Sequence, residues 1–474
     1  MSLQHWRVWQ LVIAVMVGIW SAASSLPART TAQKPEITIL AMDSAQSIVE
    51  EWAAAYASLQ PAFHYSVVAV STADELTAHL PAADVIFVEE AQAELPVTFE
   101  CRTISRVYVP LPGLVARYLD SQDCGDTLAA DTSLKAGFLH FVVSADGQQI
   151  AIDRGLLPAA VEVIDQDGVT VRVPQPVRRL ITAYGVATYY AYVVGATDRI
   201  VAASYVGVRG PASQDAMRRV DAGFDQRFTA MSVMGQQETN IEELAALRPD
   251  VVFVSARTQW IAAVEELGIP VIRFEGESPQ RLKEAVTLTG TILGPDAAYR
   301  AAMFTAYYDE MVSNIRQQTA GLSTRPRVYF SGTAPLRTIS RDMYQTAMIE
   351  LAGGVSVSQD LTGYWNDVNL EQVVLWDPDV IFVPTYGGAT VEAFTASEEW
   401  QIVRAVQEGR VYQLPQFISP WDTPVPDSTL GIIWIAEKLH PDQLNLDCAA
   451  QAQHFYRRFY EYAMPVEEAQ VLCR

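Results

Sequence analysis

From residue 37 onward, short runs of apolar residues alternate with longer segments in which apolar side chains recur at helical spacing. In the first part of the chain this pattern predicts strands at 37–40, 65–70 and 85–88, and helices at 47–58, 72–79 and 134–143. Apolar strands alternating with amphipathic helices are typical of a parallel sheet covered by helices on both faces. We therefore expect a small α/β domain over residues 36–158.

A second series of elements begins near residue 161. β-Branched residues punctuated by Asp165, Gly168 and Pro174 predict a hairpin at 163–173. Further βα units follow, with strands expected at 180–183, 199–203, 251–255, 271–274, 328–331, 380–384 and 410–414. Residues 296–318 contain neither Gly nor Pro and carry Ala, Tyr and Met at helical spacing, which predicts one long helix.

The predicted fold class is α/β, with two Rossmann-like lobes joined by one long helix and preceded by a smaller α/β domain. The expected boundaries are an N-terminal lobe at 160–295, a bridging helix at 296–320 and a C-terminal lobe at 326–474. Residues 1–33 precede these domains as a signal peptide or an N-terminal anchor.

An internal repeat connects the two lobes. Asn240-Ile241-Glu242 leads to Arg248-Pro249-Asp250 and an apolar strand, and Asn369-Leu370-Glu371 leads to Asp377-Pro378-Asp379 and another. The offset is 369 − 240 = 129 residues without a gap. Each copy reads as an N-capping Asn, a short helix opened by a carboxylate, a turn and a buried parallel strand. Such units are common in α/β proteins, but the matched Asn, Glu, Pro and Asp favour a duplicated lobe.

The N-terminus and the cysteines indicate export. Basic residues precede an apolar run at 11–20, and small residues follow it at 21–23, which is the pattern of a secretory signal. An uncleaved anchor is the alternative, although the run is shorter than a membrane span requires. Four cysteines at local spacings in an exported chain suggest two disulfides, and we pair Cys101 with Cys124 and Cys448 with Cys473.

Composition excludes some partners. The formal charge is −22 and the sequence contains no basic block, so nucleic acid is not an expected partner. Acidic surfaces mainly keep proteins soluble. Separately, we expect the protein to be a monomer.

The region from 161 to about 441 resembles the helix-bridged periplasmic binding proteins that serve ABC importers of ferric siderophores, haem and cobalamin. The resemblance rests on Asp165-Gln166-Asp167-Gly168, on Leu247-Arg248-Pro249-Asp250, on Glu350-Leu351-Ala352-Gly353-Gly354 and on Leu439-His440-Pro441, in this order and spacing. It implies an extracytoplasmic binding protein, periplasmic or at the cell surface, that delivers a solute to a membrane permease. It also implies that Glu242 and Glu371 dock into arginine pockets of that permease.

A cleft between two lobes is where a ligand is expected, because ligands bind at loops after the carboxyl ends of the strands. Aromatic faces suit a flat, apolar ligand, and arginines suit carboxylates or phosphates at its edge. The candidate ligand-binding residues are Tyr184, Tyr189, Tyr205, Arg257, Trp260, Arg337, Arg341, Tyr344, Tyr386, Trp421 and Asp422.

The histidines restrict the ligand further. Between residues 151 and 439 there is neither His nor Cys, so an imidazole or thiolate site for a naked metal ion cannot be built there. A metal would therefore arrive inside its own chelator, with a ferric siderophore as the first expectation. Cobalamin and haem are alternatives, the latter because tyrosine can serve as an axial ligand. No resident cofactor is expected.

The first domain, at 36–158, resembles one lobe of the molybdate and phosphate type of binding protein. The residues that carry this likeness are Ser44-Ala45-Gln46-Ser47 and the runs 137–141, 144–148 and 155–158. About 120 residues suffice for only one lobe. An oxyanion at the helix N-terminus near Ser44 and Ser47 would therefore remain largely hydrated.

Two other classes of function compete with a binding protein. The sequence contains no Gly-x-Ser-x-Gly elbow or Gly-rich phosphate loop, and the main domain lacks a histidine for a Ser-His relay, so we do not expect an enzyme. An extracellular sensory or adhesion module built on the same fold is the remaining alternative.

Overall fold

The computed structural model describes residues 37–90, 103–104, 107–120, 134–208, 210–230, 239–441 and 443–474. The expected signal peptide or anchor at 1–33 lies outside these residues. Within them, no helix is both long enough and apolar enough to cross a membrane.

The first domain forms one mixed sheet of six strands with the order β2-β1-β3-β6-β4, and β5 pairs with β6. The strands are β1 (Ile37–Met42), β2 (Tyr65–Val70), β3 (Val85–Glu89), β4 (Thr103–Ile104), β5 (Tyr108–Leu111) and β6 (Leu114–Asp120). The helices are α2 (Gln46–Leu59), α3 (Ala73–His79), α4 (Leu134–Val143) and α5 (Ala145–Asp153). β1, β2 and β3 are parallel as predicted, but β6 runs antiparallel to β3. The expectation of an all-parallel sheet was therefore wrong, because β5 and β6 form a hairpin around Gly113, whose φ is +78°.

The next lobe, lobe 1, contains four parallel strands in the order β10-β9-β11-β12. They are β9 (Leu180–Thr182), β10 (Ile200–Ala203), β11 (Val251–Ser255) and β12 (Val271–Phe274). The predicted hairpin precedes them as β7 (Ala160–Ile164) and β8 (Thr170–Pro174). The helices are α6 (Gly185–Val193), α7 (Pro211–Val220), α8 (Phe224–Ala230), α9 (Ile241–Ala246), α10 (Ile261–Glu265) and α11 (Pro279–Leu293).

The last lobe, lobe 2, repeats this sheet with the order β15-β13-β17-β18, again parallel. Its strands are β13 (Arg327–Phe330), β15 (Val355–Ser356), β17 (Val380–Val383) and β18 (Val411–Gln413), with a short ribbon of β14 (Arg337–Thr338) and β16 (Asn366–Asp367) beside them. Its helices are α13 (Tyr344–Leu351), α14 (Leu370–Trp376), α15 (Val391–Thr395), α16 (Arg404–Gln407), α17 (Ser428–Leu439), α18 (Cys448–Tyr460) and α19 (Val466–Leu472).

The 129-residue repeat is visible as equivalent local geometry. Asn240 caps α9 and Asn369 caps α14, each by accepting backbone N–H bonds with its side chain. Two residues with left-handed backbone follow at the same offset, Arg248 at φ 45° and Asp377 at φ 41°. The two lobes are therefore copies of one unit, as the sequence predicts.

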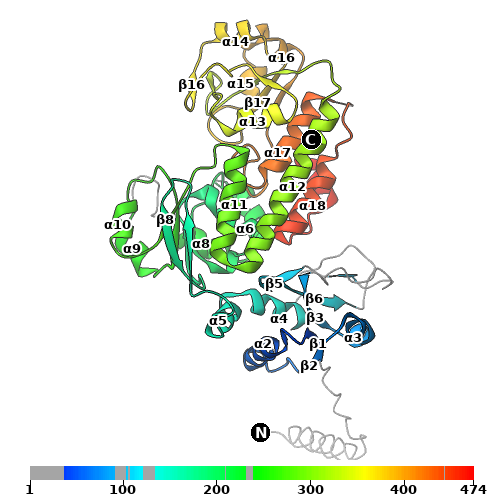
Figure 1. Cartoon of the computed structure of the whole chain (residues 1–474). Coiled ribbons are helices and arrows are strands. Elements are labelled where there is room, and N and C mark those ends of the chain that lie inside the picture. Colours follow the sequence, from blue (N-terminus) through cyan, green and yellow to red (C-terminus); the bar gives the residue numbers. More distant parts are fainter. Residues whose placement is uncertain are drawn as a thin grey trace, which may run out of the picture.

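A long helix, α12 (Pro295–Thr319), connects the lobes and matches the predicted bridge to within one residue at each end. Figure 1 shows it running from the lower end of lobe 1 up to lobe 2, beside α17 and α18. The first domain packs at the far end of this helix, where the Val109 N–H donates to Asp296 Oδ1 at 3.0 Å. Arg199 Nη2 also donates to the Val143 carbonyl at 3.1 Å. This domain is thus held on lobe 1, away from lobe 2.

Candidate functional site

The two lobes meet through the segment that follows β18. Tyr189 and Tyr190 of α6 donate their hydroxyl hydrogen bonds to the carbonyls of Ile418, at 2.7 Å, and Pro424, at 3.0 Å. Both tyrosine side chains are buried because α6 lies between the lobe 1 sheet and this segment. Two hydroxyls of lobe 1 therefore fix the backbone of lobe 2.

A glycine permits the closest approach in this contact. Gly207, in the loop after β10, has φ +76°, and its carbonyl accepts from Gln416 Nε2 at 2.8 Å. A Cβ on Gly207 would collide with the ring of Pro420. This position needs glycine both for its left-handed backbone and for its neighbour.

Beside this contact lies a pocket of about 820 Å³. Lobe 1 lines it with the loop after β10 and with the small residues of α7, and lobe 2 lines it with the loops after β17 and β18. A third wall comes from the C-terminal helix α19. The lining residues are Gly207, Gly210, Ala212, Ser213, Ala216, Arg219, Thr385, Tyr386, Gly387, Gln416, Phe417, Glu467, Glu468, Val471 and Leu472.

Most of the charged side chains that line the pocket are carboxylates, which accept hydrogen bonds. Arg219 Nη1 pairs with Glu468 Oε1 at 2.5 Å, and its guanidinium lies over the ring of Phe417, 5.4 Å from the ring centroid. Glu467 is exposed beside this pair. Among the lining residues that the structure describes, Arg219 is the one arginine, and the Glu468 carboxylate already engages it.

Behind the lobe 2 wall lies a small polar cluster. The Tyr386 hydroxyl donates to Asp422 Oδ2 at 2.6 Å, and Gln345 Nε2 lies 3.5 Å from the same hydroxyl. Burial raises the pKa of Asp422 to about 6, although the Tyr386 hydrogen bond opposes the shift. Within the described structure Asp422 Oδ1, Gln345 Oε1 and Thr385 Oγ1 are buried without a hydrogen-bond partner. The Tyr386 hydroxyl therefore donates its proton to the buried Asp422 carboxylate and not to a ligand.

A second buried carboxylate follows five residues later. Asp427 accepts from the hydroxyls of Tyr456, at 2.5 Å, and Tyr460, at 2.6 Å. Burial raises the pKa of Asp427 to about 6, and the two tyrosine hydrogen bonds oppose the shift. This group supports α17 and α18 beneath the contact between the lobes.

Two further contacts join the lobes near the strand ends. The Glu277 carboxylate of lobe 1 lies close to the backbone N–H of Tyr344, at the start of α13, and burial raises the pKa of Glu277. The Arg257 guanidinium stacks 4.0 Å from the ring centroid of Tyr364. The half-buried Tyr184 lies near the first pair, and burial raises its pKa above the usual range.

Five of the predicted ligand residues, all aromatic, pack against the hydrophobic cores. Tyr189, Trp260, Tyr344 and Trp421 are buried, and Tyr205 is half-buried against the same core as Tyr189. Tyr344, for example, shares a hydrogen bond of 2.7 Å with Ser428 across α13 and α17.

The other predicted residues do not gather in one place: Asp422 is buried behind the pocket wall, and Tyr184 and Arg257 lie at the contact between the lobes. Tyr386 lines the pocket and binds Asp422 directly behind it. Arg337 is half-buried with Nη1 3.9 Å from Asp367, and Arg341 is exposed beside Asp342. The sequence analysis did not select residues of α7 and α19. It considered the loops that directly follow the carboxyl ends of strands, and neither helix lies in such a loop.

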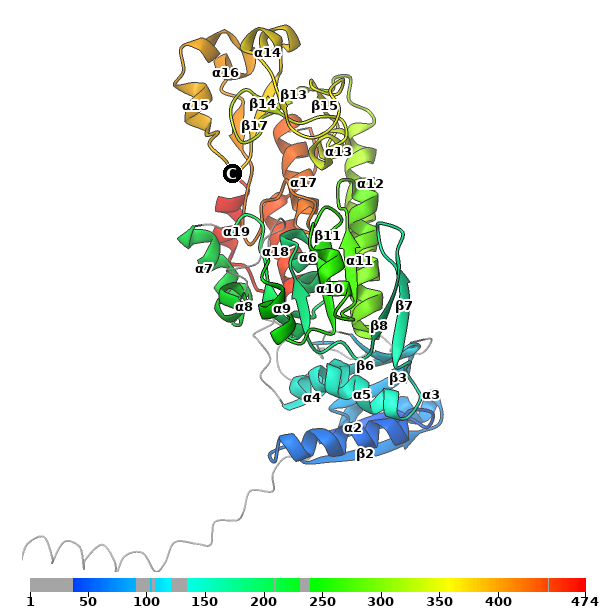
Figure 2. The ribbon, with the colours of Figure 1, turned by 90° about the vertical axis from the view of Figure 1, so that its left-hand side faces the viewer.

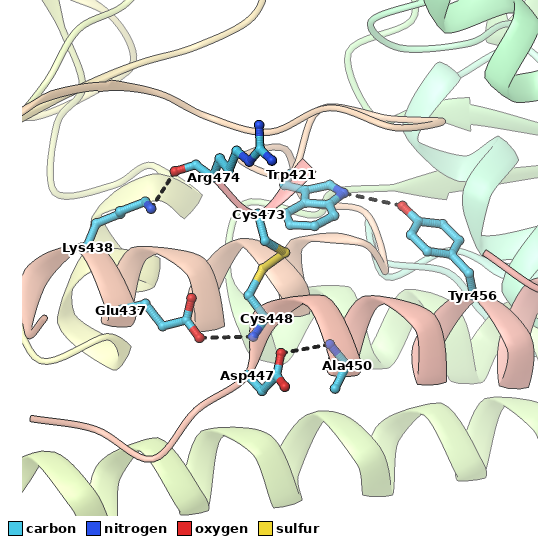
Figure 3. The surroundings of a disulfide bond; sticks show 9 residues. All are labelled: Trp421, Glu437, Lys438, Asp447, Cys448, Ala450, Tyr456, Cys473 and Arg474. Atoms are coloured by element: carbon cyan, nitrogen blue, oxygen red, sulfur yellow. Dashed lines mark hydrogen bonds between the residues drawn. A yellow bond between two sulfur atoms is a disulfide. The ribbon is translucent and has the colours of Figure 1, made fainter. Parts of the chain in front are cut away.

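The cysteine prediction is confirmed for the C-terminal pair. Cys448 and Cys473 form a disulfide with a Cα–Cα distance of 5.9 Å, joining the start of α18 to the end of α19 (Figure 3). Cys101 and Cys124 lie outside the described residues.

Two other predicted sites lie on the surface of the molecule. Glu242 and Glu371 are exposed in the first turns of α9 and α14, one in each lobe. In the first domain, Ser47 Oγ accepts from Arg154 Nη1 at 2.7 Å, and Ser44 Oγ donates to Glu89 Oε1 at 3.4 Å. Glu89 would repel an oxyanion placed at this helix N-terminus.

No group of three or more His, Cys, Asp or Glu side chains that could hold a metal ion occurs in the described part of the chain.

Comparison with known proteins extends these observations. Residues 181–417 match the family described as "Periplasmic binding protein". The molybdate-binding protein MolA of Haemophilus influenzae is 26% identical over 255 residues, covering 48% of this chain and 72% of the relative. A vitamin B12-binding protein of Vibrio cholerae is 25% identical over 248 residues, covering 51% and 82%. A periplasmic solute binding protein from Veillonella parvula has the same fold, with a TM-score of 0.57 at 22% identity over 66% of this chain and 96% of that chain.

Proposed function

This chain belongs to the periplasmic binding protein family, and from that premise we propose that it captures an organic metal chelate between its lobes for an ABC importer. A ferric siderophore is the first candidate, and cobalamin and haem are the alternatives within the same fold. In this role the protein works outside the cytoplasm, as a monomer without a resident cofactor. Glu242 and Glu371 would meet arginines of the membrane permease.

The observation that carries this proposal is the size and position of the pocket. Ligand pockets of about 300 to 1,000 Å³ hold drug-sized molecules, and this one measures about 820 Å³. Both copies of the duplicated unit contribute to its walls. A tetrahedral oxyanion is far smaller, so it would leave most of this volume filled with water.

The electrostatics support the same choice. An oxyanion site needs several converging donors, as backbone N–H groups or arginines provide. Here Arg219 is paired with Glu468, and Tyr386 directs its proton to Asp422. The wall therefore favours an organic ligand over the molybdate that one relative's name specifies.

Calorimetric titration of the purified protein tests the proposal. The probes are a ferric trihydroxamate, cyanocobalamin and haemin, with sodium molybdate as the competing oxyanion. We expect saturable one-to-one binding of a chelate and none of molybdate. Molybdate binding without chelate binding would overturn the chelate proposal.

A pair of variants ties the binding to the pocket. Ala212 is exposed on α7 and lines the pocket, so Ala212→Trp should fill it. Ala262 is exposed on α10 of the same lobe, away from the lining residues, so Ala262→Trp is the matched control. Equal chelate affinity in both variants would place the ligand elsewhere.

A further inference from the structure

The C-terminal helix α19 lies beyond the part of the chain that matches the family, which ends at residue 417. It nevertheless returns to the contact between the lobes. Four of its residues line the pocket: Glu467, Glu468, Val471 and Leu472. Figure 2 shows α19 beside α7. The lining residues place lobe 1, the strand-end loops of lobe 2 and this C-terminal helix of lobe 2 around the pocket.

Tertiary ties hold α19 in place, because seven residues are too few for a helix that is stable alone. The Cys448–Cys473 disulfide anchors its end to α18, and Lys438 Nζ donates to the Arg474 carbonyl at 2.5 Å. These ties, drawn in Figure 3, attach α19 to the C-terminal helices.

The tie to α7 is of a different kind. Glu468 accepts from Arg219 at 2.5 Å and from the Tyr462 hydroxyl at 2.9 Å. The Arg219 side chain is 47% exposed, and exposed ion pairs contribute little to stability. The helix is therefore covalently fixed on one side and only weakly latched on the other.

The chemistry of this wall is selective. Val471 and Leu472 offer apolar surface, while Glu467 and Glu468 offer carboxylate oxygens. Across the pocket, the Tyr386 hydroxyl is committed to Asp422, so its proton is not available to a ligand. The carboxylates of α19 therefore favour N–H donors on a ligand and repel carboxylates or other anionic groups.

We propose that α19 is a third wall of the ligand pocket, held against α7 by the Arg219–Glu468 ion pair. This wall selects neutral chelates that carry N–H donors at their edge over chelates with anionic edges. This inference rests on the proposed function and names the ligand class within it.

One matched pair of variants tests the wall. Val471 and Val466 are both exposed on α19, at 63% and 51%, but only Val471 belongs to the pocket lining. Calorimetry with the tightest-binding probe from the titration above should show about tenfold weaker binding for Val471→Trp, from steric exclusion. Val466→Trp should bind like the wild type. Equal binding by both variants would overturn the wall while leaving the proposed function intact.

Two matched probe pairs test the selectivity. Cyanocobalamin carries amides at its edge and haemin carries carboxylates; a neutral ferric trihydroxamate contrasts in the same way with a trianionic ferric tris-catecholate. We expect the neutral member of a pair to bind more tightly, and Glu467→Lys to reduce that preference. Tighter binding of the anionic members by the wild type would overturn the selectivity. Failure of all four probes would overturn the proposed function and this inference with it.

Discussion

The hydroxyl of Tyr190, in lobe 1, donates its hydrogen bond to the carbonyl oxygen of Pro424, in lobe 2, at 3.0 Å. Both groups are buried, so neither can exchange its partner for water. Tyr190→Phe should therefore leave a buried carbonyl unpaired and lower the free energy of unfolding by about 1 to 2 kcal/mol. Urea unfolding measures the change. Tyr412→Phe, at a half-buried tyrosine of lobe 2, is the control, and an equal loss in both variants would argue against a special role for Tyr190.

Gly207 allows a second prediction, on the close approach of the lobes. Gly207→Ala adds a Cβ at φ +76° that collides with Pro420, so we expect a loss of roughly 3 kcal/mol, from backbone strain and overpacking together.

Gly268 provides the control for that loss. It has the same φ of +76° but no atom within 4 Å of an added Cβ. Gly268→Ala should therefore cost only the backbone strain, about 1 kcal/mol. Thermal unfolding compares the two variants, and equal shifts in Tm would mean that the contact with Pro420 is unimportant.

The buried Asp427 predicts a pH dependence of stability. Its pKa is about 6 in the folded chain and 3.8 when unperturbed, so the folded chain holds this proton more tightly than the unfolded chain. The stabilisation is full below pH 3.8 and is lost as the pH rises through 6. Asp422 acts in the same direction.

Asp427→Asn removes this titration while keeping a carbonyl oxygen for one of the tyrosine hydroxyls. The free energy of unfolding of the wild type, relative to the variant, should be larger at pH 5 than at pH 7. Chemical unfolding at both pH values gives the difference. A difference that grows toward pH 7 would mean that burial does not raise this pKa.

The exposed glutamates at the lobe tips lead to a functional prediction. Replacing Glu242 and Glu371 together by Ala should abolish uptake while leaving chelate affinity unchanged, because neither residue lines the pocket. Uptake assays with calorimetry in parallel separate the two effects. Glu162 and Glu350, exposed on β7 and α13, form the control pair. Normal uptake by the tip variant would remove the docking role.

The repeat, the bridging helix and the C-terminal disulfide were predictable because each depends on local pattern. Asn240 and Asn369 mark helix starts by side-chain capping, and the strands that follow are continuous apolar runs. The duplication goes further than the sequence reveals. The backbone N–H of Arg179 donates to Asp250 Oδ2, and that of Arg327 donates to Asp379 Oδ2. The aspartates keep the offset of 379 − 250 = 129 residues, whereas the arginines are 327 − 179 = 148 residues apart.

The lining of the pocket was much less predictable. The loop rule selected aromatic residues near strand ends, but Tyr189 and Trp421 lie where a second layer of structure covers them. The rule cannot distinguish a residue facing a cleft from one facing a packed helix. The rule could not select α19 for another reason. Val471 reaches the pocket only through contacts between distant parts of the chain.

Native mass spectrometry of the protein purified from its source tests the central claim most directly. If the pocket holds an organic chelate, the intact protein should carry one non-covalent adduct of several hundred daltons or more, and Ala212→Trp should lose it while Ala262→Trp keeps it. An adduct with the mass of a bare oxyanion, or an organic adduct that Ala212→Trp retains in full, would contradict the account.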